Sequence, residues 1–155
     1  MSDDTAEGSG AAARAVARIS SDAALATALE IRREVFIEVQ DVPEDLELDG
    51  LDGEATHFLA RADGEPVGTA RLRDYGDGLA KVERVAVREP RREEGWGERI
   101  MTAVEEHARE AGYDRVRLAA QVPVVGFYER LGYEVVGEEF MDAGIPHRSM
   151  EKPLG

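Results

Sequence analysis

The chain has 155 residues, of which 33 are aspartate or glutamate and 19 are lysine or arginine, giving a formal net charge of −14. This length fits one domain with its own core, and the charge disfavours nucleic acid and an anionic membrane as partners. The sequence contains no cysteine, which excludes disulfides, thiolate metal sites and a cysteine nucleophile.

The first residues, 1–15, are acidic, small or glycine and lack the basic start and apolar stretch of a secretory signal. We therefore expect a disordered acidic N-terminal tail over 1–15, a single domain over 16–155, and a cytoplasmic location. Lys81 and Lys152 are the only lysines. An acidic, lysine-poor surface is typical of halophilic proteins. The alternative, a field that attracts cationic amines, would be screened at molar salt, where the Debye length is about 3 Å.

Hydrophobic periodicity predicts alternating strands and helices. Residues 14–20 form a strand candidate, and a helix capped by Ser20, Ser21 or Asp22 should end before Pro43. The elements expected after the acidic connection 41–54 are strands 56–63, 65–76 and 79–89 with turns at Asp63-Gly64 and Asp77-Gly78, helix 97–111, strand 114–121, helix 123–132, and strands 133–141 and 147–154. The order predicts an α/β or α+β domain with a mixed sheet and helices on its faces.

The segment between strand 79–89 and helix 97–111 has the pattern Arg92-x-x-Gly95-x-Gly97. Glycines let the main chain approach an anion closely, and the first-turn N–H groups and dipole of a helix attract phosphate. Arg88, Arg91 and Arg92 would add charge-assisted donors. Taken alone, the two glycines fit a plain loop equally well, and neither a Walker loop nor a Rossmann fingerprint is present.

A second motif, GFYERLGY at 126–133, follows strand 114–121. Together with the preceding V-x-V-x(4)-R-x-x-G-x-G it resembles the acetyl-CoA-binding core of the GNAT N-acetyltransferases. The segments REVFIEVQDVPEDLELDGLD and EEFMDAGIPHRSM resemble a bacterial and archaeal branch whose acceptor is often unassigned. The resemblance covers about residues 16–153. It implies a mixed, mostly antiparallel sheet flanked by helices and an enzyme that transfers an acetyl group from acetyl-CoA to a primary amine.

The same resemblance implies roles for particular residues. Val85, Ala86 and Val87 would offer main-chain N–H groups to the thioester carbonyl and the pantetheine amides. Tyr128 would protonate the departing thiolate, since the pKa of a free tyrosine near 10 keeps it protonated at neutral pH. With no cysteine to carry the acetyl group, direct attack by the amine is expected. The pyrophosphate site would consist of Arg92, Glu93, Glu94, Gly95, Trp96, Gly97 and Glu98.

Four further features each have a functional and a structural interpretation. Glu83 could be the general base through a water molecule, or it could lie on a solvated strand face. His147 could stand near the acceptor and titrate in the useful pH range, or be a hydrogen-bonded residue at a strand start. Gln121 could bond to pantetheine or close its strand. The acidic run 41–54 could line the acceptor cleft or form a solvated loop.

The remaining expectations concern ligands, partners and an alternative function. Three scattered histidines form no metal-binding pattern, so no metal is expected. Glu93 and Glu94 stand where the family usually has small or basic residues, and their carboxylates would repel a pyrophosphate if they faced it. The expected acceptor is a small-molecule or peptide amine. The sequence leaves open whether the protein forms a homodimer. The alternative function is a non-catalytic acyl-CoA-binding sensor or interaction module.

Overall fold

The computed structural model describes residues 14–155, so most of the predicted disordered tail lies outside the described residues. The first strand starts at Arg14, two residues before the predicted domain boundary. The helices and strands are β1 (Arg14–Arg18), α1 (Asp22–Arg32), α2 (Glu44–Glu47), β2 (Thr56–Ala62), β3 (Glu65–Asp74), β4 (Leu79–Val87), α3 (Trp96–Glu110), β5 (Arg115–Gln121), α4 (Val125–Arg130), β6 (Glu134–Val135), β7 (Phe140–Asp142) and β8 (Ile145–Pro153).

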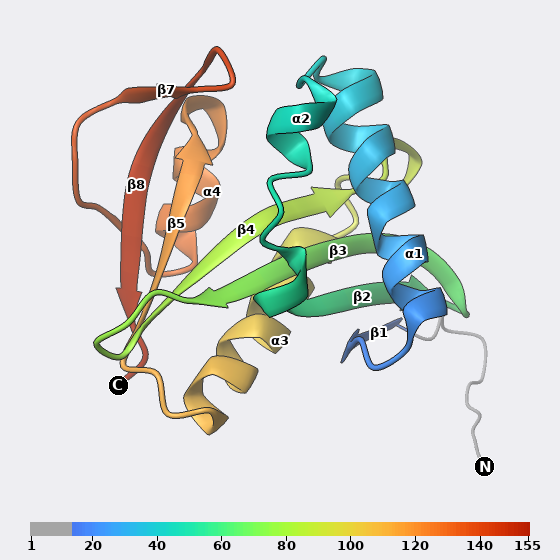
Figure 1. Ribbon diagram of the computed structural model, residues 1–155. Coiled ribbons are helices and arrows are strands. Elements are labelled where there is room, and N and C mark those ends of the chain that lie inside the picture. Colours follow the sequence, from blue (N-terminus) through green and yellow to red (C-terminus); the bar gives the residue numbers. More distant parts are fainter. Residues whose placement is uncertain (1–13) are drawn as a thin grey trace.

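The strands form one eight-stranded sheet in the order β1-β2-β3-β4-β5-β8-β6, with β7 pairing to β8 beside this path. Among the strand pairs of residues 14–155, β4 and β5 run parallel and the others antiparallel. The sheet is flanked by helices (Figure 1). The predicted mixed, mostly antiparallel α/β (α+β) fold is therefore confirmed. None of the described helices is both long and apolar enough to cross a membrane.

The two faces of the sheet carry separate hydrophobic clusters. On one face, Ile100, Met101 and Val104 of α3 pack with buried residues of β2 to β5. On the other face, Ile31 at the end of α1 packs with Leu59 of β2 and with a π-helical continuation of α1, Arg33–Val39. Helices α1 and α2 thus lie on the side of the sheet opposite to α3 (Figure 1).

Local signals in the sequence account for several element ends. The Ser21 hydroxyl accepts a hydrogen bond from Ala24 N (3.1 Å), which caps α1. Asp63 (φ 51°) and Gly64 (φ 86°) make the predicted turn between β2 and β3, because both turn residues of such a hairpin need a positive φ. The boundaries of α3 agree with the predicted helix to within one residue.

The structure differs from the expected elements in three places. The single strand predicted at 133–141 is wrong: β6 ends at Val135 and β7 starts at Phe140. Arg148 binds the Gly137 carbonyl oxygen through Nε (3.1 Å) and a terminal nitrogen (2.9 Å), so side-chain contacts replace a strand ladder there. In addition, helix 123–132 begins as a 3₁₀ turn over Val122–Val124, and α2 forms inside the acidic connection.

Candidate active site

A cleft opens where the two parallel strands separate. β4 and β5 pair only from Leu79↔Arg115 to Val82↔Leu118. Beyond that point the strands diverge, and a cleft of about 520 Å³ lies between them. Residues from the π-helical segment Arg33–Val39 through to β8 line this cleft, among them Val85, Ala86, Val87, Arg92, Gln121, Tyr128 and His147. The structure therefore brings together candidates that are far apart in the sequence.

A β-bulge accompanies this separation. Thr69 faces Ala86 while Arg71 faces Glu83, so that β4 has one residue more than β3 over the same interval. Arg84, inside the bulge, has φ 57°, which is uncommon for a residue other than glycine. A bulge bends its strand and re-aims the residues that follow it. From Glu83 onward, the edge of β4 that faces β5 has no strand partner within residues 14–155.

The turn before α3 presents free main-chain donors. Glu93 (φ 68°) and Gly95 (φ 83°) turn the chain into the helix. The N–H groups of residues 93–98 have no backbone acceptor in the described part of the chain, as expected for the first turn of a helix. Arg92 lines the cleft beside this turn, and its Nε donates to Val87 O (3.0 Å). Unpaired N–H groups with the positive end of the helix dipole suit an anion.

The carboxylate of Glu94 is paired with neighbouring donors. Trp96 Nε1 (3.1 Å) and Arg91 Nε (3.0 Å) both donate to Glu94 Oε1. The bond from Trp96 and then that from Arg91 lower the pKa of Glu94. The expected repulsion is therefore partly neutralised at Glu94. The indole of Trp96 is buried in the core (1% exposed), so only its main-chain N–H can face an anion.

Gly97 lets two helices approach closely. A Cβ atom at Gly97 would stand 3.0 Å from Cζ of Phe127 on α4, tighter than ordinary van der Waals contact. Phe127 lines the cleft and makes an edge-to-face contact with Tyr128 (ring centroids 5.0 Å apart). The glycine at this position thus sets how near the start of α3 lies to the cleft wall formed by α4.

Tyr128 and His147 both line the cleft from positions that are largely buried (8% exposed each). Burial raises the pKa of Tyr128 to about 12, so its hydroxyl stays protonated at neutral pH. His147 Nδ1 is 2.7 Å from Ile145 O, which fits Nδ1 as the protonated nitrogen and leaves Nε2 without a partner in the described residues. His147 is paired in register with Gln121, whose Nε2 donates to Gln40 Oε1 (3.0 Å).

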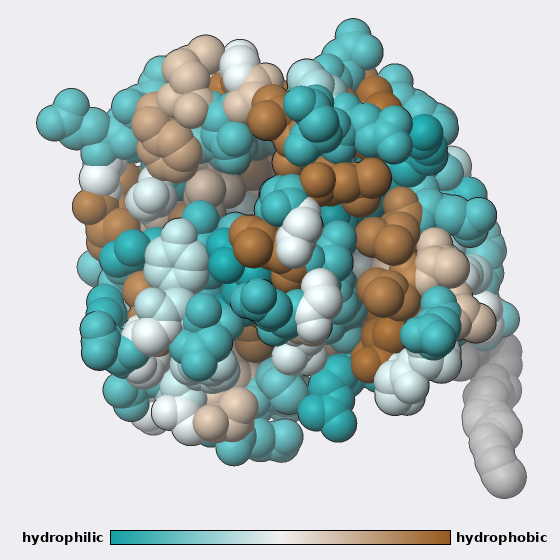
Figure 2. Space-filling model, viewed as in Figure 1, coloured by the Kyte–Doolittle hydropathy of each residue, from teal (hydrophilic) through white to brown (hydrophobic). Residues whose placement is uncertain are grey.

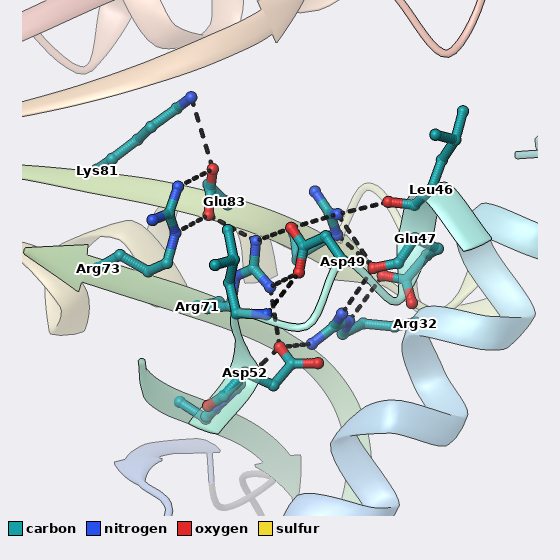
Figure 3. A network of polar contacts seen from close by, with 12 residues as sticks. Arg32, Leu46, Glu47, Asp49, Asp52, Arg71, Arg73, Lys81 and Glu83 are labelled. Carbon is teal, nitrogen blue, oxygen red and sulfur yellow. Dashed lines mark hydrogen bonds and ion pairs between the residues drawn. The ribbon is translucent and has the colours of Figure 1, made fainter. Parts of the chain in front are cut away.

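Glu83 does not lie on a solvated face, and its surroundings argue against a base. Its carboxylate accepts from Arg71 (2.6 Å) and from Arg73 (2.7 and 3.1 Å) and lies 3.5 Å from Lys81 Nζ (Figure 3). Burial alone would raise the pKa of Glu83, but the bonds from Arg73 and Arg71 outweigh it and lower the pKa to about 2. A carboxylate this acidic takes up a proton poorly at neutral pH.

The acidic run 41–54 is only in part a solvated loop, which corrects the structural interpretation. Its carboxylates Glu47, Asp49 and Asp52 accept bonds from arginines of α1, β3 and β4 (Figure 3). Glu47 is 2% exposed and, with Leu46, lines the cleft. We call the connected groups the arginine network; its members are Arg32, Glu47, Asp49, Asp52, Arg71, Arg73, Lys81, Glu83 and Arg84.

The arginines of this network were not identified from the sequence. Arg71 is fully buried (0% exposed) although residues 66–72 around it in β3 are otherwise uncharged. Arg84 connects the bulge of β4 to α2, because its Nε donates to Glu47 Oε2 (3.0 Å). A charged residue inside an apolar strand was the only signal available, and it does not say which partner neutralises the charge.

Comparison with known proteins gives the family. The family model described as acetyltransferase (GNAT) domain matches residues 13–154. The chain belongs to the GNAT acetyltransferase family. The uncharacterized N-acetyltransferase YjcF of Bacillus subtilis is 42% identical to this GNAT chain over 129 residues, which are 83% of this chain and 91% of YjcF.

Solved GNAT structures agree with this assignment. A candidate N-acetyltransferase from Lactobacillus plantarum has a TM-score of 0.86 and 29% identity, covering 92% of this chain and 99% of that one. A GNAT family acetyltransferase from Elizabethkingia anophelis with acetyl-CoA bound has a TM-score of 0.69 and 14% identity, covering 90% and 97% of the two chains; at this identity the likeness concerns the fold alone.

Proposed function

We propose that this protein transfers an acetyl group from acetyl-CoA to a primary amine by direct attack of the amine. The observation that carries the proposal is the separation of β4 from β5 after Val82 and Leu118, which opens a cleft of about 520 Å³ beside a turn with free N–H groups. Membership of the GNAT family supports acyl transfer. The absence of cysteine supports direct attack, because no thiol can carry the acetyl group.

The described residues fit coenzyme A. The N–H groups of residues 93–98 and Arg92 would hold the diphosphate, and the free edge of β4 at Val85–Val87 would bind the pantetheine amides. Bound acetyl-CoA would supply an activated thioester carbonyl. The amides at that edge are fixed by the bulge before reaction, so they would stabilise negative charge on the carbonyl oxygen without reorganisation.

Tyr128 is the proposed general acid. Tyr128 lines the cleft, and its hydroxyl is protonated at neutral pH because burial raises the pKa of Tyr128 to about 12. A proton donor is needed where the thiolate departs. Removing the hydroxyl while keeping the ring should therefore slow the reaction without disturbing the packing between Tyr128 and Tyr133 (ring centroids 5.8 Å apart).

His147 is the proposed general base. Its Nδ1 contacts the Ile145 carbonyl oxygen, which would hold the neutral ring with Nε2 free to accept a proton from the amine. Glu83 is less suited to this role, since two arginines already occupy its carboxylate. The pairing of Glu83 with Arg71 and Arg73 also favours the second candidate function, a CoA-binding sensor without turnover.

Release of free thiol from acetyl-CoA with a panel of amines tests the proposal. Tyr128→Phe is expected to lower kcat about 10²-fold or more and to leave the KM for acetyl-CoA nearly unchanged. A variant with the normal rate would remove Tyr128 from the mechanism. Calorimetry with CoA separates the two functions: binding without turnover of any amine would favour the sensor, and no CoA binding would contradict both.

A further inference from the structure

The face of the sheet that carries α1 and α2 also carries a group of cations. Arg73 of β3 is opposite Lys81 of β4, which is opposite Arg117 of β5. Residues in register on neighbouring strands project to the same side of a sheet, as do residues two apart in one strand, so Arg115 joins them. We call Arg73, Lys81, Arg115 and Arg117 the basic face.

The basic face has an excess of positive charge although the whole chain has a net charge of −14. The carboxylates in contact with these four cations are Glu83, which pairs with Arg73 and Lys81, and Glu151, which pairs with Arg115 and Arg117. Four cations therefore share two carboxylates in contact with them, and Glu134 of β6, in register with Glu151, adds a third carboxylate on this side.

Donors remain free in this group. Lys81 contacts Glu83 only at 3.5 Å, and Figure 3 shows it at one end of the arginine network with that single ion pair. Arg73 and Arg117 each use Nε and one terminal nitrogen on a carboxylate. The other terminal nitrogen of each has no hydrogen-bond partner among residues 14–155, and the Arg73 guanidinium and Lys81 Nζ also lie over the Tyr75 ring, 5.4 and 5.2 Å from its centroid. An anion could therefore bind without breaking an existing ion pair.

The basic face continues into the cleft. Lys81 and Glu83 line the cleft, as does Gln121 at the end of β5. From Gln121 to Arg117 the distance along β5 is four residues, or roughly 13 Å. Helices α1 and α2 cover β2 to β4 on this side, whereas no helix lies there over β5 and β8 (Figure 1). In the same view, the surface in front of β4 is mostly hydrophilic, and hydrophobic residues gather along α1 (Figure 2).

Most carboxylates at the cleft are already neutralised. The cleft is lined by Glu47, Glu83 and Asp142. Arginines hold the first two: Glu47 accepts from Arg32 and Arg84, and Glu83 from Arg71 and Arg73. A polycationic acceptor would thus find little free negative charge here. The charge distribution favours an acceptor of the opposite sign.

We propose that the acceptor is an elongated amine with an anionic group at its far end, a carboxylate or a phosphate. The amine lies in the cleft beside Tyr128 and His147, and the anionic group binds the basic face through Lys81 and Arg117. This inference names the substrate class of the proposed acetyl transfer and rests on that function. The span between the two ends is roughly 13 Å.

Calorimetric titration tests the inference without requiring turnover. The ligands are unbranched ω-amino carboxylates of increasing chain length, their ω-amino amides, and ω-amino phosphonates, each titrated into the protein with and without CoA. The carboxylate or phosphonate of matching length is expected to bind at least about tenfold more tightly than the neutral amide. This difference in affinity should shrink at high salt. Tighter binding of one anion identifies which of the two groups the acceptor carries.

Charge-neutral variants locate the effect. Lys81→Gln and Arg117→Gln are expected to remove most of the preference for the anion and to leave the affinity for the amide unchanged. Lys152→Gln is the matched control, because Lys152 has the same side-chain exposure as Lys81 (22%) but lies in register with the buried Val116, on the opposite face.

Two results would overturn the inference: equal affinity for the amide and the anion, or equal effects of Lys81→Gln and Lys152→Gln. Its failure differs from failure of the proposed function. Thiol release with neutral amines alone would contradict only the anionic acceptor. A lack of thiol release with every amine would contradict acetyl transfer, while the titrations would still measure the preference for an anion.

Discussion

Neutralising Glu47 should destabilise the protein through the arginine that it holds. Glu47 on α2 is 2% exposed and accepts from Arg32 Nε at 2.8 Å, and Arg32 is itself 1% exposed. Glu47→Gln keeps the size of the side chain and removes its charge. Arg32 then keeps Asp52 (2.7 Å) as its charged partner. Arg84 keeps Asp49 (3.2 Å) as its charged partner and the main-chain oxygens of Leu46 and Glu47 as acceptors.

The expected loss follows from the cost of a buried charge. Removing one partner of a buried ion pair costs about 3–5 kcal/mol, and the remaining bond to Asp52 favours the lower end. For a chain of 155 residues, each kcal/mol lowers Tm by about 2–4 °C. A loss of about 3 kcal/mol therefore lowers the Tm of Glu47→Gln by roughly 6–12 °C.

Thermal unfolding followed by circular dichroism measures this shift, and α2 supplies the control. Glu44 is 58% exposed and lies 3.5 Å from Arg33, which is 50% exposed. An exposed pair contributes about 0–1 kcal/mol, so Glu44→Gln should lower Tm by less than about 4 °C. Equal shifts for the two variants would show that the network contributes no more than surface charge and would refute this reasoning.

Two other variants test the surroundings of the cleft. The pKa of Glu83 is lowered from 4.5 to about 2, so the contribution of its carboxylate to stability is complete above about pH 4.5 and is lost as the pH falls toward about 2. Over this pH range the urea midpoint of Glu83→Gln should therefore fall less steeply than that of the wild type. Equal slopes for the two proteins would contradict the argument. Gly97→Ala would place a Cβ 3.0 Å from Phe127, so we expect it to lower the free energy of unfolding by about 1–3 kcal/mol and to raise the KM for acetyl-CoA. The control Gly53→Ala, whose Cβ would have nothing within 4 Å, should behave like the wild type.

The sequence by itself determined most of the elements and the family. Helix α3 and the β2–β3 and β3–β4 hairpins were predicted because hydrophobic periodicity and the turn pairs Asp63-Gly64 and Asp77-Gly78 are local signals, and local signals need no knowledge of distant neighbours. The motifs around Gly95 and Tyr128 indicated the GNAT family, which the family model confirms. The positions of β6 and β7 were missed because side-chain contacts from Arg148 replace the ladder at Gly137.

Only the tertiary structure decided the electrostatics of the site. Whether Glu83 is a free carboxylate depends on Arg71 and Arg73, and the burial of Glu47 depends on Arg32 from another element. Such pairings join residues that are ten or more positions apart, and nothing in the local pattern chooses one arginine over another. Charge interactions depend on distance and burial in space, so the network and the basic face appear only once the strands are in register.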